Sequence, residues 1–178
     1  MLDRKQKLSE HFSLEELTKT SFKTADNNEP PLEAVGNLYD LCNNWLEELR
    51  FNYNTIYVLN SIEDYYTSEE VEPLVINQGF RSCQVMSEME KAGLKPSRSS
   101  NHLTGCAVDI RCAGVEQAIR YMAILIDIAD QKKQEFDELI LERRETRSQV
   151  TTHASHVYWL HFAARPKDNR RKIRFMAG

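Results

Sequence analysis

Glycine, proline and cysteine are all scarce in this chain of 178 residues, which contains six glycines, five prolines and four cysteines. So little glycine and proline excludes a collagen-like or low-complexity protein. The cysteines show no CxxC spacing, and we expect them to be reduced and packed. Hydrophobic residues at 41% and charged residues at 28% are typical of a globular protein. With the length, they predict one domain over residues 1–178.

Long apolar runs and an excess of positive charge are also lacking. No segment approaches the length of a transmembrane helix, so we expect no transmembrane segment. The first residues, Met1–Lys7, are charged and no apolar stretch of signal length follows them, which predicts a protein that starts in the cytoplasm. A net charge of −4 argues against general nucleic-acid binding. The segment Arg165–Arg174 is locally basic, and we interpret it as a solvated edge.

Hydrophobic periodicity and capping signals predict an α+β fold, with helices packed on a small, mostly antiparallel sheet. Ser13 and Glu16 form a capping box at the start of a first helix. Further helices are expected over residues 31–50, 83–92 and 115–129, and strands over residues 55–59, 74–77, 106–110, 138–142 and 157–162. The acidic segment Ser61–Glu72 is interpreted as a surface excursion, with the shaping of one wall of the cleft as its alternative role.

Two short stretches carry the most specific chemistry. The first, Ser99–Ile110, contains His102 and Asp109 seven positions apart, and the second, Trp159–Phe162, contains His161. A turn followed by a strand would let these three side chains converge on one ion. Zinc accepts imidazole nitrogen and carboxylate oxygen together, and three protein ligands leave a fourth position for water. That is the arrangement of a catalytic zinc site.

The same residue types also have ordinary structural roles. Without a metal, His102 would cap a turn, Asp109 would be a strand-end carboxylate and His161 would be a core histidine. Cys106 and Cys112 flank Asp109 and are rival ligands. Cys106 lies an odd number of positions from Asp109, however, and so points to the other face of a strand. The order of the motifs favours the zinc site.

The pattern Ser-x-His-x-x-Gly-x-Ala-x-Asp over Ser100–Asp109, with a later Trp-x-His, resembles the zinc D-alanyl-D-alanine carboxypeptidase family. Relatives of that family include phage L-alanyl-D-glutamate endolysins and the hedgehog signalling domain. Further matching segments occur in the family's order, at His11–Leu17, Ile76–Ser82, Phe136–Ile140 and Asn169–Arg171. The resemblance spans roughly residues 11–172 and implies a hedgehog-like or D-Ala-D-Ala-peptidase-like fold.

This resemblance also implies roles for individual residues. The metal ligands would be His102, Asp109 and His161, the cofactor zinc, and the substrates peptidoglycan stem peptides cut at bonds that involve D-amino acids. Arg81 matches an arginine that engages the substrate or the developing oxyanion, because a guanidinium fork suits either. A structural salt bridge is its alternative role. Ser100 matches a serine that contacts the substrate, or else is a turn residue.

The sequence departs from the family pattern at the position of the general base. Many members of the family carry Glu or Asp three residues before the last histidine, but this chain has Tyr158 there, and a phenol is a poor base at neutral pH. We expect Glu142 to substitute, since a carboxylate on the neighbouring strand can approach the same metal. His156 matches a histidine found in some members, and is expected to stabilise the oxyanion or relay a proton.

Three functions are therefore compatible with the sequence. The first is a zinc peptidase acting on peptidoglycan stem peptides. The second is a catalytically impaired zinc domain that binds cell-wall peptides or a protein partner, and the third is a chance pattern without metal. A wall hydrolase without an export signal resembles a phage or prophage lysis enzyme, which is held in the cytoplasm until release or is carried on a virion. A cytoplasmic role on recycled or imported muropeptides is the alternative.

Overall fold

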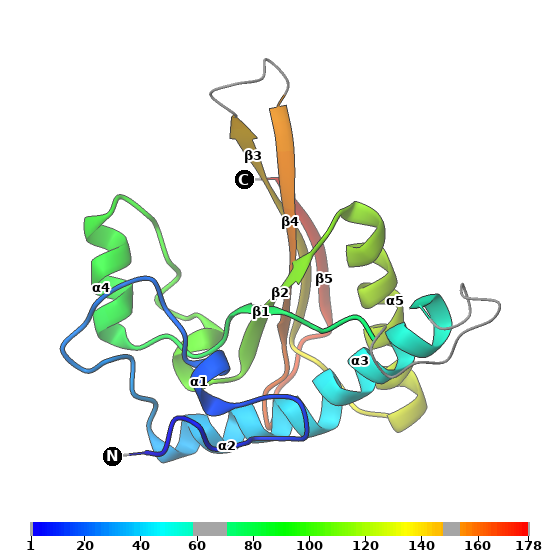
Figure 1. Ribbon diagram of the computed structural model, residues 1–178, viewed down its shortest axis with the longest axis horizontal. Coiled ribbons are helices and arrows are strands. Elements are labelled where there is room, and N and C mark those ends of the chain that lie inside the picture. The colour runs from blue at the N-terminus through cyan, green and yellow to red at the C-terminus, as the bar shows by residue number, and fades with distance from the viewer. Residues whose placement is uncertain (1, 59–70, 148–153, 178) are drawn as a thin grey trace.

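The computed structural model describes residues 2–58, 71–147 and 154–177, and the centre of this part of the chain is a five-stranded sheet (Figure 1). The strands are β1 (Ile76–Gln78), β2 (Ala107–Cys112), β3 (Glu138–Arg147), β4 (Ala154–Ala163) and β5 (Lys172–Ala177), in the order β1-β2-β4-β3-β5. All neighbouring strands are antiparallel except β3 and β5, which are parallel. The predicted α+β class with a mostly antiparallel sheet is confirmed.

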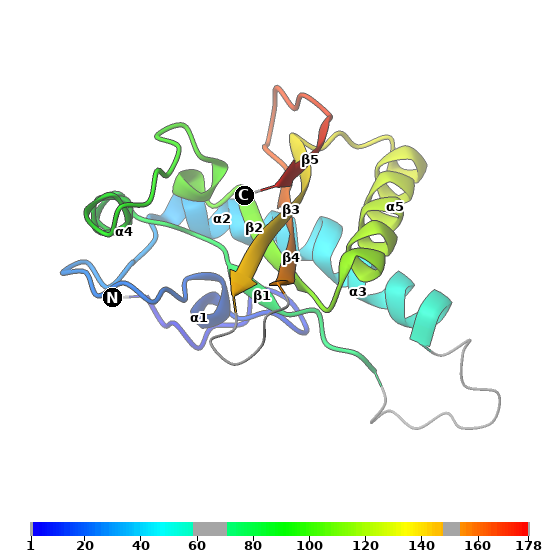
Figure 2. The same cartoon turned by 90° about the horizontal axis from the view of Figure 1, so that it is seen from above.

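Helices cover one face of this sheet. α5 (Val115–Lys132) and α3 (Glu47–Tyr53) lie together on that side, and α2 (Leu32–Leu41) continues beneath the sheet (Figures 1 and 2). Trp45, between α2 and α3, packs on Phe136 and Phe162 with ring centroids 6.5 and 5.1 Å away. The strands bury alternate apolar residues against these helices, namely Val108, Ile110, Leu139, Leu141, Leu160 and Phe162.

The predicted helix over residues 31–50 continues further than expected. Two π-helical segments, η1 (Cys42–Leu46) and η2 (Asn54–Val58), extend it without a break to Val58. The predicted strand over residues 55–59 is therefore wrong, and residue 59 lies outside the described residues. Tertiary packing overrides the local β preference: the Tyr57 ring lies 5.6 Å from the Tyr53 ring, and the Arg120 guanidinium lies 4.4 Å above it.

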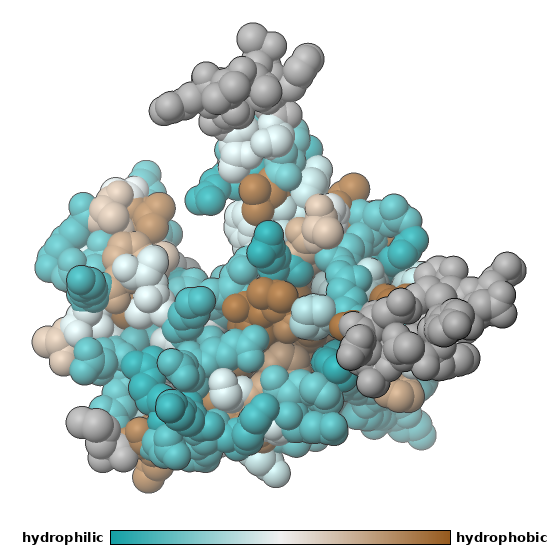
Figure 3. All heavy atoms as spheres, in the orientation of Figure 1, coloured by the Kyte–Doolittle hydropathy of each residue, from teal (hydrophilic) through white to brown (hydrophobic). Residues whose placement is uncertain are grey.

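The opposite face of the sheet is left open by the helices and faces a smaller lobe. This lobe contains α1 (Leu14–Leu17), α4 (Cys83–Lys91) and the 3-10 helix η4 (Asn101–Thr104). Ser13 caps α1 as predicted, its hydroxyl accepting from the Glu16 amide at 3.3 Å. Figure 3 shows the surface hollowed between the α4 lobe and the hairpin of β3 and β4. The open face of the sheet forms one wall of that hollow.

The remaining differences between prediction and structure concern the lengths of the strands. β3 and β4 are longer than predicted, and β5 adds an edge strand within and beyond the basic segment. The predicted strand over 74–77 is observed only as the short β1. Most of the acidic segment Ser61–Glu72 lies outside the described residues. Among the described helices, none combines the length and apolar character that crossing a bilayer requires.

Candidate metal centre

Asp109 and His161 occupy directly opposed positions in the ladder between β2 and β4. Opposed residues project from the same face of a sheet, and here that is the open face, because their neighbours Val108, Ile110 and Leu160 are buried on the other side. The Oδ1 atom of Asp109 lies 2.9 Å from Nδ1 of His161. The strand register therefore brings together two groups that are 52 positions apart in the sequence.

His102 reaches the same point from the 3-10 helix η4. The Ser100 hydroxyl accepts from the amide of His102 at 3.4 Å, and Gly105 ends the helix with φ of 72°. A Cβ atom at Gly105 would lie 2.5 Å from the carbonyl oxygen of Ala34, so only glycine fits. The Ser100–Gly105 turn thus fixes where His102 projects.

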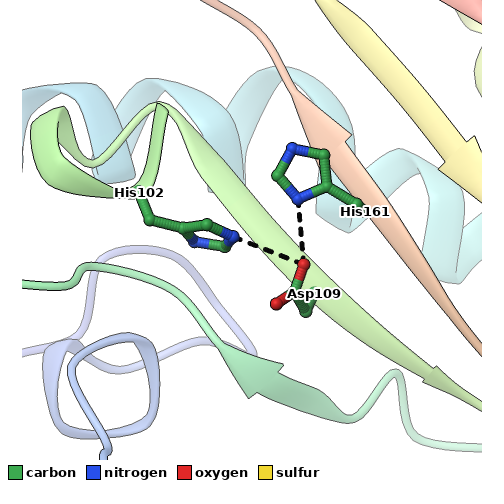
Figure 4. A group of neighbouring side chains, drawn as sticks. All are labelled: His102, Asp109 and His161. Carbon is green, nitrogen blue, oxygen red and sulfur yellow. Dashed lines mark hydrogen bonds and ion pairs between the residues drawn. The ribbon is translucent and has the colours of Figure 1, made fainter. Parts of the chain in front are cut away.

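The ring of His102 has a defined orientation. Its Nδ1 lies 2.6 Å from the carbonyl oxygen of Gly79, which can only accept, so Nδ1 carries the hydrogen. The other ring nitrogen, Nε2, lies 3.3 Å from Oδ1 of Asp109 (Figure 4), and in a neutral ring it carries the lone pair. A backbone carbonyl that fixes the tautomer of a histidine is a common partner of metal-ligating imidazoles.

The three side chains form a compact donor set. One ligand atom from each of His102, Asp109 and His161 lies within 4.8 Å of the other two. Two imidazole nitrogens and one carboxylate oxygen are a donor set that zinc accepts in a catalytic site. Cys106 and Cys112 are buried and do not belong to this group.

The electrostatics of the cluster are strongly coupled. Burial alone would raise the pKa of Asp109, but the adjacent His102 and His161 outweigh it and hold that pKa well below its usual range. Burial alone would lower the pKa of His161, but the carboxylates of Asp109 and Glu138 raise it to about 9. In the absence of a cation, His161 is therefore protonated at neutral pH and balances the buried Asp109.

Glu142 projects from the same face of the sheet, on β3. It lies opposite Trp159, and Ile140, two positions away, lies opposite His161. Burial and the charge of Asp109 raise the pKa of Glu142, while His161 and Arg81 act in the other direction. The structure thus brings this predicted base into the electrostatic environment of the cluster.

Arg81 is buried close to the same group, with a side chain that lacks a full set of partners. Only 8% of its surface is exposed, and Nη2 donates to Oε1 of Gln78 at 2.5 Å while Nη1 contacts Sδ of Met86 at 3.9 Å. Its Nε has no hydrogen-bond partner, and no described carboxylate pairs with the guanidinium. Burial lowers its pKa, against the fields of Asp109 and Glu142. The predicted alternative of a structural salt bridge finds no partner among these residues.

The other predicted site residues are placed differently. His156 is opposed to Glu145 in the ladder of β3 and β4, an odd number of positions from His161, so it projects from the face opposite the cluster. Its ring lies 6.2 Å from that of Tyr158, which shares this face. The structure therefore does not bring His156 to the metal centre. Ser100 lies beside the metal centre, but the Ser100 hydroxyl already caps the turn that carries His102.

Glu138 is a member of the site that the sequence did not identify. It lies on β3, two positions before Ile140, and its Oε2 is 3.7 Å from Nε2 of His161. The facing histidine, together with Lys172 and Arg170, lowers its pKa to about 2. The alternation of Glu138, Ile140 and Glu142 along the predicted strand was the available signal, because it places both carboxylates on one face.

Comparison of the chain with family models, curated proteins and solved structures finds no match.

Proposed function

We propose that the chain is a zinc-dependent peptidase that hydrolyses bonds involving D-amino acids in peptidoglycan stem peptides. The observation that carries this proposal is the convergence of the His102, Asp109 and His161 ligand atoms within 4.8 Å of one another. The ring of His102 is already oriented by Gly79, which leaves Nε2 facing Asp109 as a metal ligand would. The group also lies on the face of the sheet that the helices leave open, with His102 and His161 largely buried and Asp109 partly exposed.

The residues around the ligands supply the other functions that peptide hydrolysis requires. A bound zinc ion would polarise the scissile carbonyl and lower the pKa of a water molecule. Glu142 would accept the proton from the attacking water and pass it to the leaving amine, and its raised pKa suits a base that works near neutral pH. Arg81 would hold the developing oxyanion or a substrate carboxylate, and its Nε–H has no partner among the described residues.

The substrate class follows from the resemblance of the sequence motifs to the zinc D-alanyl-D-alanine carboxypeptidases. We propose with it that the α+β fold is the hedgehog-like or D-Ala-D-Ala-peptidase-like fold of that family. The hollow between the α4 lobe and the β3–β4 hairpin is open along the surface, and an extended peptide fits such a shape (Figure 3). Two specific activities belong to this class, removal of a C-terminal D-alanine and cleavage between L-alanine and D-glutamate.

The test combines metal analysis with hydrolysis. We expect one zinc per chain after reconstitution, retained by His156→Ala and lost by the His102→Ala/His161→Ala double variant. A synthetic stem pentapeptide would then be incubated with the zinc-loaded protein, and mass spectrometry would separate the two cleavage positions. Stoichiometric zinc without hydrolysis of the pentapeptide or of whole sacculi would favour the zinc domain that only binds wall peptides or a partner. Absence of zinc would remove both functions.

A further inference from the structure

We propose that Glu138 is a positioning residue for His161, which holds the hydrogen on Nε2 and thereby leaves Nδ1 as the metal-binding nitrogen. The proposal rests on the metal centre described above. It extends that centre to a carboxylate on β3, and through it to the C-terminal segment of the chain.

The first argument is the geometry of the His161 ring. Nδ1 lies 2.9 Å from Oδ1 of Asp109, on the side of the other ligands, while Nε2 lies 3.7 Å from Oε2 of Glu138, on the opposite side. A neutral imidazole carries one hydrogen, and the nitrogen without it is the ligand. A carboxylate beside Nε2 favours the hydrogen there, so the lone pair remains on the nitrogen that faces Asp109 and His102.

The second argument is that Glu138 is itself held in place. Its Oε1 accepts from Nζ of Lys172 at 2.7 Å and lies 3.0 Å from Nη2 of Arg170. Two cations on Oε1 leave Oε2 to face Nε2 of His161, with Nδ2 of Asn101 at 3.4 Å. A carboxylate fixed from both sides is a better orienting group than a freely rotating surface glutamate.

The third argument is the contrast between the two histidines. His102 is oriented by the neutral carbonyl of Gly79, whereas His161 faces the charged Glu138. A charged acceptor makes the opposite ring nitrogen more basic than a neutral one does. His161 would therefore be the stronger of the two imidazole ligands, with a strength that depends on one side chain.

A zinc-affinity series tests this assignment. Competition with a chromophoric chelator would measure the dissociation constant of wild type, Glu138→Gln, Glu138→Ala and Lys172→Met, with Glu135→Gln as the matched control. Glu135 pairs with Arg171 at the surface and does not contact His161. We expect Glu138→Ala to weaken zinc binding by about 10–100-fold and Glu138→Gln by less, because the amide keeps the shape and one acceptor oxygen. Lys172→Met should change affinity in the same direction, and Glu135→Gln should match wild type.

A second readout separates positioning from general structural damage. The visible absorption of Co²⁺ bound at the site depends on the ligand field, so Glu138→Gln should shift its bands while circular dichroism stays unchanged. If wild type binds zinc and both Glu138 variants bind it equally well with unaltered cobalt spectra, the positioning role is excluded and the metal centre stands. If wild type itself binds no zinc, the metal centre fails and the role of Glu138 falls with it.

Discussion

Asp109 and His161 are opposed residues in the β2–β4 ladder, and their side chains also contact each other. Oδ1 of Asp109 lies 2.9 Å from Nδ1 of His161. In the metal-free protein this contact is an ion pair, because the pKa of His161 is raised to about 9 and that of Asp109 is held well below its usual range. A cation that binds both residues must therefore displace the proton on His161.

Zinc binding should accordingly release a proton. At about pH 7, below the pKa of His161 in the metal-free protein, we expect about one proton to leave per zinc bound. Affinity should rise with pH and level off above about 9, the pKa of His161. The measurement is isothermal titration calorimetry in buffers of different ionisation enthalpy. An apparent binding enthalpy that is the same in every buffer would contradict this assignment.

Replacing Arg81 should impair turnover rather than folding. Arg81→Lys keeps the charge but loses the planar fork and the Nε–H that has no partner among the described residues. We expect kcat to fall by about 10²-fold, the loss typical of one oxyanion donor, with zinc content unchanged. Arg143→Lys, on an exposed position of the opposite face of β3, is the control. Equal kcat values for the two variants would assign Arg81 to structure.

Glu142→Gln removes the proposed proton acceptor while keeping its shape. Turnover should fall by about 10²–10⁴-fold with zinc retained, as expected from the loss of a general base. Tyr158→Glu supplies the contrasting variant, since position 158 lies on the face opposite the cluster. It should neither raise the activity of the wild type nor restore that of Glu142→Gln. Rescue by Tyr158→Glu would place the base on β4 instead.

Gly79→Ala should destabilise the protein and weaken the site. A Cβ atom there would lie 2.3 Å from the carbonyl oxygen of Leu17, and the displaced Gly79 carbonyl is the acceptor for Nδ1 of His102. We expect a loss of about 1–3 kcal/mol in the free energy of unfolding. Gly36→Ala, in α2, adds a Cβ that meets no described atom within 4 Å apart from its own stretch of helix, and it should instead stabilise by about 0.5–1 kcal/mol. Urea denaturation of both variants makes the comparison.

The sequence predicted the α+β class, most helices and the three converging residues, because each depends on periodicity or on a local motif. The alternation that argues against Cys106 as a ligand also argues against His156, which lies an odd number of positions from His161. The sequence alone therefore contained the signal that His156 lies on the other face of its strand from His161.

Other features depend on tertiary contacts that no local pattern contains. The helical state of Thr55–Val58 requires the stacking of Tyr57 on Tyr53 and the cation from α5 above it. The contact of Glu138 with His161 requires the register of β3 against β4, and its fixed position requires β5. Strand alternation places Glu138 on the correct face, but it does not identify the cations that hold it.

The interval between Asp109 and His161 has a kinetic consequence. The chain between them forms α5 and β3, and β4 pairs with β2 only after this interval has been closed. Closing so long a segment costs conformational entropy that is recovered only when native contacts form around it. We therefore expect the three ligands to converge only when β4 docks on β2. A bound ion that spans the two strands would then hold them together and slow unfolding.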